Sequence, residues 1–262
     1  MKIGIMDSGI GGLTVLKECL SLLPAHEYLY YADSNNAPYG TKSKEEVYRL
    51  TARVVDYLVK MKADIIVIAC NTATSAAAVH LRKKYDIPII GMEPAIKPAL
   101  TAARNKRILV AATGLTLYEQ KFRDLITALD AQHRVDNVDL TELVAFAEAG
   151  DFSRNTIVSF LTEKLANFNL ELYGSVVLGC THFPLFRKHF AEVFPVGTVI
   201  IDGAVGTANR VKEFVIFDSN EPKMSFFLSG ELLVSGSLFK RICDIIEMEV
   251  SEDDEKTLSK FK

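Results

Sequence analysis

The chain has 262 residues, of which 49% are hydrophobic and 24% charged, and its formal net charge is −3. This composition is typical of a soluble globular protein with a substantial core, and a weakly acidic chain without a basic cluster is not suited to bind nucleic acid. The sequence contains neither an apolar run of about 18 residues nor a signal-peptide segment, so we expect a cytoplasmic protein that does not enter a membrane.

Strands and helices are expected to alternate along the first part of the chain. Apolar runs predict strands at 2–6, 28–32, 65–69 and 87–91, and periodic or alanine-rich segments predict helices at 13–23, 43–60, 71–85 and 94–103. Ser43 and Glu46 form an S-x-x-E capping box at the start of the second helix. Uninterrupted β-branched runs are typical of strands buried on both faces. The alternation therefore predicts a parallel, doubly wound α/β sheet.

A second series of the same kind follows. Strands are expected at 107–112, 136–143, 175–178, 198–202 and 224–228, helices at 116–128, 152–168, 184–194, 206–217 and 237–249, and a loop or short helix at 144–150.

The two series match one another at nearly constant offsets. Thr113 lies 105 residues after Ser8, and Cys180 lies 110 residues after Cys70. Such near-collinear halves suggest an old duplication, which predicts two lobes related by a pseudo-twofold axis with the active site in the cleft between them. We assign 1–95 and 206–262 to the first lobe, with 252–262 as a frayed tail, and 96–205 to the second lobe.

Two of the four cysteines stand where parallel sheets place their ligands. Cys70 and Cys180 each follow a buried strand and precede an expected helix, whereas Cys19 and Cys243 have the spacing of core residues. A helix N-terminus lowers the pKa of a thiol below about 8.5, so both thiols are expected to ionise readily. Two opposed thiols could remove a proton from one face of a carbon and return one to the other. That chemistry is racemisation or epimerisation, and it needs no metal or cofactor.

Polar residues follow the same strand ends and could bind a carboxylate and stabilise developing charge. They are Asp7, Ser8, Asn71, Thr72, Thr113 and Thr181, while His182 could tune the thiol of Cys180. Three other interpretations remain. The first is a buried structural pair of cysteines, which would need no polar neighbours, yet polar residues follow both cysteines directly. The second is a zinc site of Cys70, Cys180 and His182, which lacks an evident fourth ligand. The third is a Cys–His hydrolase, which would leave one cysteine unexplained.

A glycine-rich turn at 9–12 lies between the first strand and the first helix. It reads G-x-G-G-x-T, so Thr14 occupies the third glycine position of a dinucleotide fingerprint, and Asp33 is not followed by a helix. A nicotinamide or flavin site is therefore disfavoured. The turn can still form an anion cradle with Ser8, or serve only as a tight turn.

Four stretches resemble the signature sequences of bacterial glutamate racemases: 7–12 (DSGIGG), 37–40 (APYG), 69–72 (ACNT) and 179–184 (GCTHFP). Their order and spacing are similar, and the resemblance extends from residue 1 to about 245. The cysteine stretches are shared with the wider aspartate/glutamate racemase superfamily, and the other two are more particular to the glutamate enzymes. The resemblance implies cofactor-free, metal-free interconversion of L- and D-glutamate that supplies peptidoglycan synthesis. We expect a homodimer.

The resemblance also implies roles for individual residues. Cys70 would be the base for D-glutamate, assisted by Asp7, and Cys180 the base for L-glutamate, assisted by His182; Glu148 matches a further acid. The substrate would be bound by Asp7, Ser8, Tyr39, Gly40, Asn71, Thr72, Thr113, Thr116, Thr181 and His182. Tyr39 is expected to be exposed in its loop.

One segment departs from the pattern of the racemases. Members often carry Thr-x-x-Thr-x-x-Ser-x-x-Tyr, whereas here Thr113 and Thr116 are followed by Glu119 and Phe122. These two positions are interpreted as helix packing or a lobe contact. Alternative functions are a racemase of aspartate or another small acid, a single-cysteine decarboxylase, which the second cysteine disfavours, and a binding protein that has lost turnover.

Overall fold

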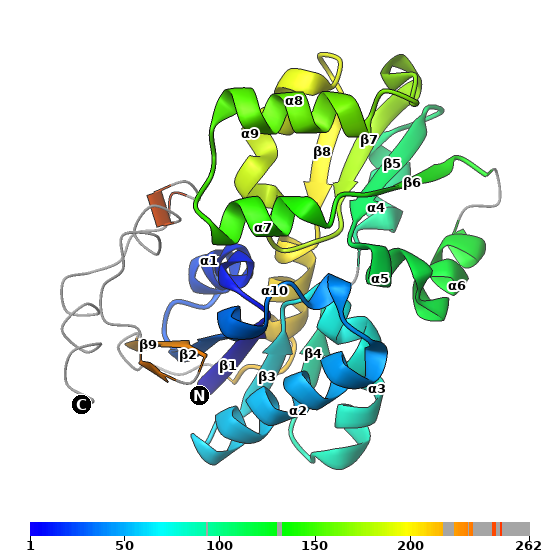
Figure 1. The fold of residues 1–262 in the computed structure, drawn as a ribbon. Helices are drawn as coiled ribbons and strands as arrows, with labels where there is room; N and C mark the ends of the chain where they lie inside the picture. The colour runs from blue at the N-terminus through cyan, green and yellow to red at the C-terminus, as the bar shows by residue number, and fades with distance from the viewer. Residues whose placement is uncertain are drawn as a thin grey trace.

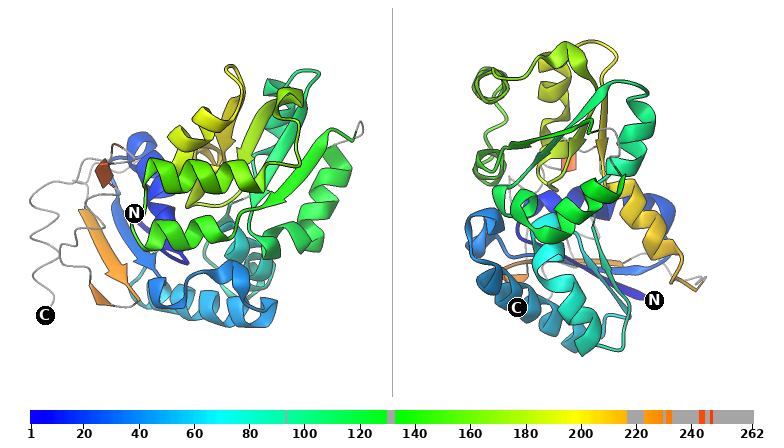
Figure 2. Two further views of the ribbon diagram at one scale, coloured as in Figure 1. Left: turned by 45° about the horizontal axis from the view of Figure 1, so that its top comes forward. Right: turned by 90° about the vertical axis from the view of Figure 1, so that its right-hand side faces the viewer.

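The computed structural model describes residues 1–92, 94–129, 133–216, 223–229, 231–232, 243–244 and 247. They form two lobes, each built on a mainly parallel sheet with helices on both faces (Figure 1). The right-hand view of Figure 2 shows the two lobes one above the other. The predicted fold class is confirmed. None of the helices in the described ranges is long and apolar enough to cross a membrane.

The sheet of the first lobe has the strand order β10-β9-β2-β1-β3-β4, and β10 is antiparallel to β9. Its strands are β1 (Lys2–Asp7), β2 (Glu27–Ala32), β3 (Ile65–Ile68), β4 (Ile89–Gly91), β9 (Lys223–Leu228) and β10 (Glu231–Leu232). Helices α2 (Lys44–Lys60) and α3 (Asn71–Lys84) bury one face, and α1 (Leu13–Leu22) packs on the other together with α10 (Ala204–Lys212).

The sheet of the second lobe has the order β6-β5-β7-β8 and is parallel throughout. Its strands are β5 (Arg107–Ala112), β6 (Val135–Asp139), β7 (Tyr173–Leu178) and β8 (Val199–Asp202). One face is covered by α4 (Ile96–Ala102), α5 (Gly114–Tyr118) and α6 (Gln120–Leu129), and the other by α7 (Glu142–Glu148), α8 (Arg154–Lys164) and α9 (Arg187–Val193). Short 3-10 helices at Ile10–Gly12, Ser34–Asn36, Tyr39–Thr41, Leu170–Leu172 and Phe183–Phe186 complete the described elements.

The two sheets repeat one topology. The order β2-β1-β3-β4 in the first lobe corresponds to β6-β5-β7-β8 in the second. The register is also repeated, because Ile3 pairs with Ile65 as Ile108 pairs with Ser175, at the offsets of 105 and 110 seen in the sequence. The repeat seen in the sequence is therefore matched by a repeated strand order, which is consistent with the inferred duplication, while the exact lobe boundaries remain a prediction.

Several element boundaries differ from the predictions. The helix expected at 116–128 is two helices, because Glu119 has an extended backbone (ψ 137°) between α5 and α6. The strand expected at 136–143 ends at Asp139, whose carboxylate accepts a hydrogen bond from the backbone N–H of Thr141 and so turns the chain into α7. The helix expected at 184–194 begins as the 3-10 helix Phe183–Phe186. The predicted helix 237–249 and tail 252–262 lie mainly or wholly outside the described residues.

The predicted cap of α2 is present. The Ser43 hydroxyl accepts a hydrogen bond from the backbone N–H of Glu46 at 3.2 Å, which satisfies one of the free donors of the first turn. Glu45 and Glu46 lie in the same turn, where the helix dipole favours negative charge. The helix therefore starts at a fixed point just after the loop that carries Tyr39 and Gly40.

Candidate active site

Cys70 and Cys180 occupy equivalent positions, each two residues beyond the end of its strand, β3 or β7. Both are buried, with exposures of 5% and 8%. The Sγ of Cys70 accepts hydrogen bonds from the Ser8 hydroxyl at 3.5 Å and from the backbone N–H of Ala73 at 3.4 Å. The Sγ of Cys180 lies 3.8 Å from Nδ1 of His182. Each thiol thus has its own polar partners.

The expectation that Cys70 ionises readily is wrong. Burial, followed by the negative charge of Asp7, raises the pKa of the Cys70 thiol to about 12. Hydrogen bonds from the Ser8 hydroxyl and from the backbone N–H of Ala73 oppose this rise in the pKa but do not outweigh it. Cys70 is consequently held as the neutral thiol.

A histidine–carboxylate pair lies behind Cys180. His182 Nε2 is 2.7 Å from Oε1 of Glu148, and the same oxygen accepts a hydrogen bond from the backbone N–H of Ile10 at 2.8 Å. Burial alone would lower the pKa of His182, but hydrogen bonds and the negative charges of Cys180 and Glu148 raise it well above its usual value. Burial would likewise raise the pKa of Glu148, and His182 with the Ile10 N–H holds it below its usual value. This arrangement favours an imidazolium beside Cys180.

Asp7 lies at the end of β1, fully buried between the lobes. Its carboxylate accepts hydrogen bonds from the backbone N–H groups of Gly9 and Gly12 and from the hydroxyl of Thr181, at 3.1 to 3.2 Å for the nearest contacts. Burial raises the pKa of Asp7 to about 6, although His182 and these donors oppose the rise. Asp7 therefore changes charge closer to neutrality than an ordinary carboxylate.

Three threonine hydroxyls form a buried triangle between the lobes. Thr72 Oγ1 is 2.9 Å from Thr113 Oγ1 and 3.2 Å from Thr116 Oγ1, and the latter two are 3.0 Å apart. The backbone of Gly40 lies against this triangle, because a Cβ added there would be 2.7 Å from Cβ of Thr113. The structure thus brings together substrate-binding residues predicted from both lobes.

The prediction that Tyr39 is exposed is wrong, because only 1% of its surface is accessible. Its hydroxyl donates to Asp33 at 2.7 Å, and Asn36 and Arg53 donate to the same buried carboxylate. Sequence reasoning weighed Asp33 only as a ribose ligand and missed this anchoring role. The available signal was an acidic residue at the end of β2, directly before a loop of turn-forming residues.

Asn71 joins the two cysteine-bearing strand ends. Its amide nitrogen donates to the backbone carbonyl of Gly179 at 2.8 Å, one residue before Cys180. Its side-chain oxygen is buried and has no hydrogen-bond partner in the structure. A buried acceptor of this kind is costly unless it receives a donor, so this oxygen is suited to a ligand N–H group.

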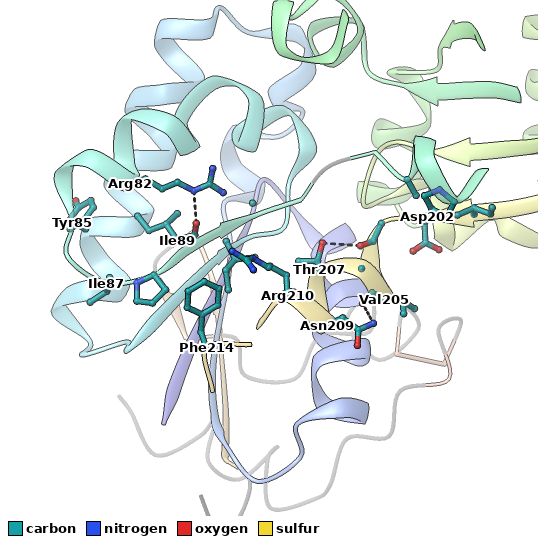
Figure 3. Close-up of a pocket in the computed structure, with 18 of the residues that line it drawn as sticks. Arg82, Tyr85, Ile87, Ile89, Asp202, Val205, Thr207, Asn209, Arg210 and Phe214 are labelled. Atoms are coloured by element: carbon teal, nitrogen blue, oxygen red, sulfur yellow. Dashed lines mark hydrogen bonds between the residues drawn. The ribbon is translucent and has the colours of Figure 1, made fainter. Parts of the chain in front are cut away.

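A further cavity lies elsewhere. It has a volume of about 1230 Å³ and lies where the chain crosses between the lobes, lined by residues that include Arg82, Asp202, Arg210 and Phe214 (Figure 3). Neither cysteine lines it. The described residues contain no group of three or more His, Cys, Asp or Glu side chains arranged to hold a metal ion.

The raised pKa of Asp7 predicts a pH-dependent effect on stability. The native state keeps the Asp7 proton up to about pH 6, whereas the unfolded chain releases it near pH 4, so stability falls as pH rises between these values. Asp7→Asn should therefore raise the free energy of unfolding by about 2–3 kcal/mol at pH 7.5 and have little effect at pH 4. Urea denaturation of both proteins at the two pH values measures this. An equal effect at both values would contradict it.

Comparison with known proteins gives concordant matches. A family model described as Asp/Glu/Hydantoin racemase matches residues 3–211. A glutamate racemase of Halothermothrix orenii is 49% identical over 216 residues, covering 82% of this chain and 85% of that protein. Glutamate racemase 2 of Bacillus subtilis is 44% identical over 257 residues, covering 94% and 97%. The crystal structure of Escherichia coli glutamate racemase with L-glutamate and the activator UDP-MurNAc-Ala has a TM-score of 0.76 and 28% identity, covering 94% of each chain.

Proposed function

The chain belongs to the Asp/Glu/hydantoin racemase family, and we propose that it interconverts L- and D-glutamate by proton transfer between two cysteines. The observation that carries this proposal is the pair Cys70 and Cys180, buried at equivalent strand ends of two repeated sheets. A pseudo-twofold arrangement presents one thiol to each face of a carbon held between the lobes. Racemisation requires this placement, because the proton must leave one face and return to the other.

In the direction from L to D, the Cys180 thiolate removes the α-proton of L-glutamate. The Cys70 thiol then gives its proton to the opposite face, which leaves a thiol at 180 and a thiolate at 70, and the reverse steps convert D-glutamate. Burial raises the pKa of Cys70 to about 12, so Cys70 is proposed to begin this direction as the proton-donating thiol, and His182, whose Nδ1 lies 3.8 Å from the Cys180 Sγ, is proposed to assist Cys180. Asp7 lies close enough to Cys70 to influence its ionisation and is proposed to assist it.

Substrate binding is proposed to use the polar groups between the thiols. The buried oxygen of Asn71 is suited to accept from the substrate ammonium, and the hydroxyls of Ser8, Thr72, Thr113, Thr116 and Thr181 are suited to its carboxylates. Gly40 brings its backbone against Thr113. Tyr39 commits its hydroxyl to Asp33, so its contribution would come from its ring or backbone.

The wider parts of the proposal rest on the resemblance to glutamate racemases. They are a reaction without cofactor or metal, a supply of D-glutamate for peptidoglycan, a cytoplasmic location and a homodimeric assembly. The E. coli relative is crystallised with L-glutamate, which supports glutamate as the substrate proposed for this chain.

The proposal is tested by incubating the purified protein with L-glutamate in D₂O without added cofactor. We expect the α-proton NMR signal and the optical activity to disappear together, because each inversion delivers a solvent-derived deuteron. A chelator should leave the rate unchanged. Exchange with aspartate but not with glutamate would identify aspartate, rather than glutamate, as the substrate. Absence of exchange with either amino acid would refute the racemase proposal.

A further inference from the structure

Lys44 and Glu119 form an ion pair across the two lobes, close to the substrate-binding threonines but outside the catalytic set. Nζ of Lys44, in the first turn of α2, is 2.6 Å from Oε2 of Glu119, between α5 and α6. The Glu119 side chain is 9% exposed and that of Lys44 is 48% exposed. Among the ion pairs in which both partners lie in the described ranges, this one joins an element packed on the first sheet to an element packed on the second.

Both partners occupy positions that their local structure does not favour. Lys44 is the first residue of α2, where the helix dipole favours negative charge. Glu119 places a carboxylate in a largely buried position, which costs free energy unless the charge is paired. The carboxylate of Glu119 provides a negative charge at the start of α2, and the ammonium group of Lys44 provides a partner for the buried carboxylate. The pairing therefore offsets the unfavourable position of each charge.

The pair lies one turn beyond residues assigned to substrate binding on both sides. Lys44 follows Gly40 by four residues, and Glu119 follows Thr116 by three. The 3-10 helix Tyr39–Thr41 packs against α5, and Gly40 touches Thr113. Glu119 also ends α5 and starts α6, since its carbonyl accepts from the backbone N–H of Phe122. The ion pair thus lies beside the contact between the 3-10 helix Tyr39–Thr41 and the segment that carries Thr113 and Thr116.

We propose that the Lys44–Glu119 ion pair is a latch that keeps the lobes closed over the substrate and so positions the loop that carries Tyr39 and Gly40. This inference rests on the proposed function for its kinetic consequences but not for its structural ones. Substrate must enter between lobes whose catalytic thiols are buried, so the latch must open and re-form in each turnover. It gives a role to Glu119, a position that the sequence analysis interpreted as helix packing or a lobe contact.

Removing either charge should weaken substrate binding more than chemistry. In Lys44→Met and Glu119→Gln we expect KM for both enantiomers to rise about tenfold and kcat to change less than about threefold, because the open state gains population but the thiols and their partners are intact. The charge-swapped double variant Lys44→Glu/Glu119→Lys should recover most of the loss. Raising the salt concentration should raise the KM of the wild type toward that of the single variants.

The matched controls break an ion pair within one lobe. Lys42 and Glu46 pair at 3.4 Å around the same helix start, so Lys42→Met and Glu46→Gln remove equal charges without affecting a cross-lobe contact. We expect KM within about twofold of the wild type for both. An equal rise of KM in the controls and the latch variants, or no rise in the latch variants, would overturn the proposal.

A second readout does not depend on turnover. The rate of alkylation of Cys70 and Cys180 by iodoacetamide, followed by mass spectrometry, should rise several-fold in Lys44→Met and Glu119→Gln and return toward the wild-type rate in the swapped variant. Cys19, on the buried face of α1, serves as the internal reference for global unfolding. Faster alkylation without any racemisation in the wild type would support the latch and refute the proposed function. Unchanged alkylation would overturn the latch even in an active racemase.

Discussion

Cys70→Ser and Cys180→Ser are each expected to lower kcat for racemisation by about 10²–10⁴-fold, because a hydroxyl replaces the thiol that we propose exchanges the α-proton. A serine is close in size, so the burial of each site should be preserved. The equilibrium constant between enantiomers is one, so kcat/KM must fall equally in the two directions. Steady-state rates therefore reveal the loss of activity but do not show which cysteine acts on which face of the substrate α-carbon.

Proton exchange without inversion assigns each cysteine to one face of the substrate α-carbon. With Cys180 replaced, Cys70 should still remove the α-proton of D-glutamate and return a deuteron to the same face, giving slow label uptake by D- but not L-glutamate. Cys70→Ser should show the opposite preference. Cys19→Ala provides the control, since Cys19 lies in the core away from the site and its loss should leave kcat within about twofold. More than a tenth of the wild-type kcat in both serine variants would contradict the two-thiol mechanism.

Gly11→Ala should reduce kcat/KM by at least about 100-fold, since displacement of a catalytic group by about 1 Å has effects of this size. A Cβ at Gly11 would lie 2.6 Å from both the backbone nitrogen and Nδ1 of His182. The backbone of His182 cannot yield as a flexible side chain would, so the imidazole must move away from Cys180. The absence of a side chain at Gly11 thus allows the close approach of the glycine turn to His182 of the other lobe.

Gly206→Ala is the matched control for this substitution. Gly206 lies in α10, and an added Cβ meets no atom within 4 Å. Because alanine is the better helix former, this variant should keep full activity and gain up to about 1 kcal/mol in the free energy of unfolding. Kinetics and thermal unfolding of both variants test the pair. If kcat/KM of Gly11→Ala stays within tenfold of the wild type, the steric argument is wrong.

Local patterns were sufficient for much of the fold. The β-branched run 65–68 predicted a buried parallel strand, and the matching offsets around Ser8 and Cys70 predicted the repeated sheet. The cysteines were located correctly because the ends of parallel strands converge whatever the rest of the chain does. Predictions failed where the outcome depended on residues distant in sequence. The pKa of Cys70 is the clearest case, because burial and the charge of Asp7 raise it, whereas the helix that follows Cys70 predicted that it would fall.

The neighbours of the candidate catalytic residues show the same limit. His182 and Glu148 are 34 residues apart and meet only because α7 packs against the segment after β7. The buried bond between Tyr39 and Asp33, and the pairing of Glu119 with Lys44, likewise join residues that no local pattern links. The resemblance to racemases named Glu148 but gave no reason for it; the structure supplies the contact with His182.

The position of β9 has a consequence for biosynthesis. All four strands of the second sheet lie within residues 107–202 and leave the ribosome as one uninterrupted unit, whereas the first sheet receives β9 only when residues 223–228 emerge. Until then the nascent chain exposes the backbone edge of β2, and α1 lacks its packing partner α10 until residues 204–212 have emerged. Unpaired edges of this kind recruit other chains. The lobe whose synthesis begins first is therefore the one completed last. A chain that stalls before residue 223 has an incomplete first sheet, and its unpaired β2 edge can bind chaperones or other chains.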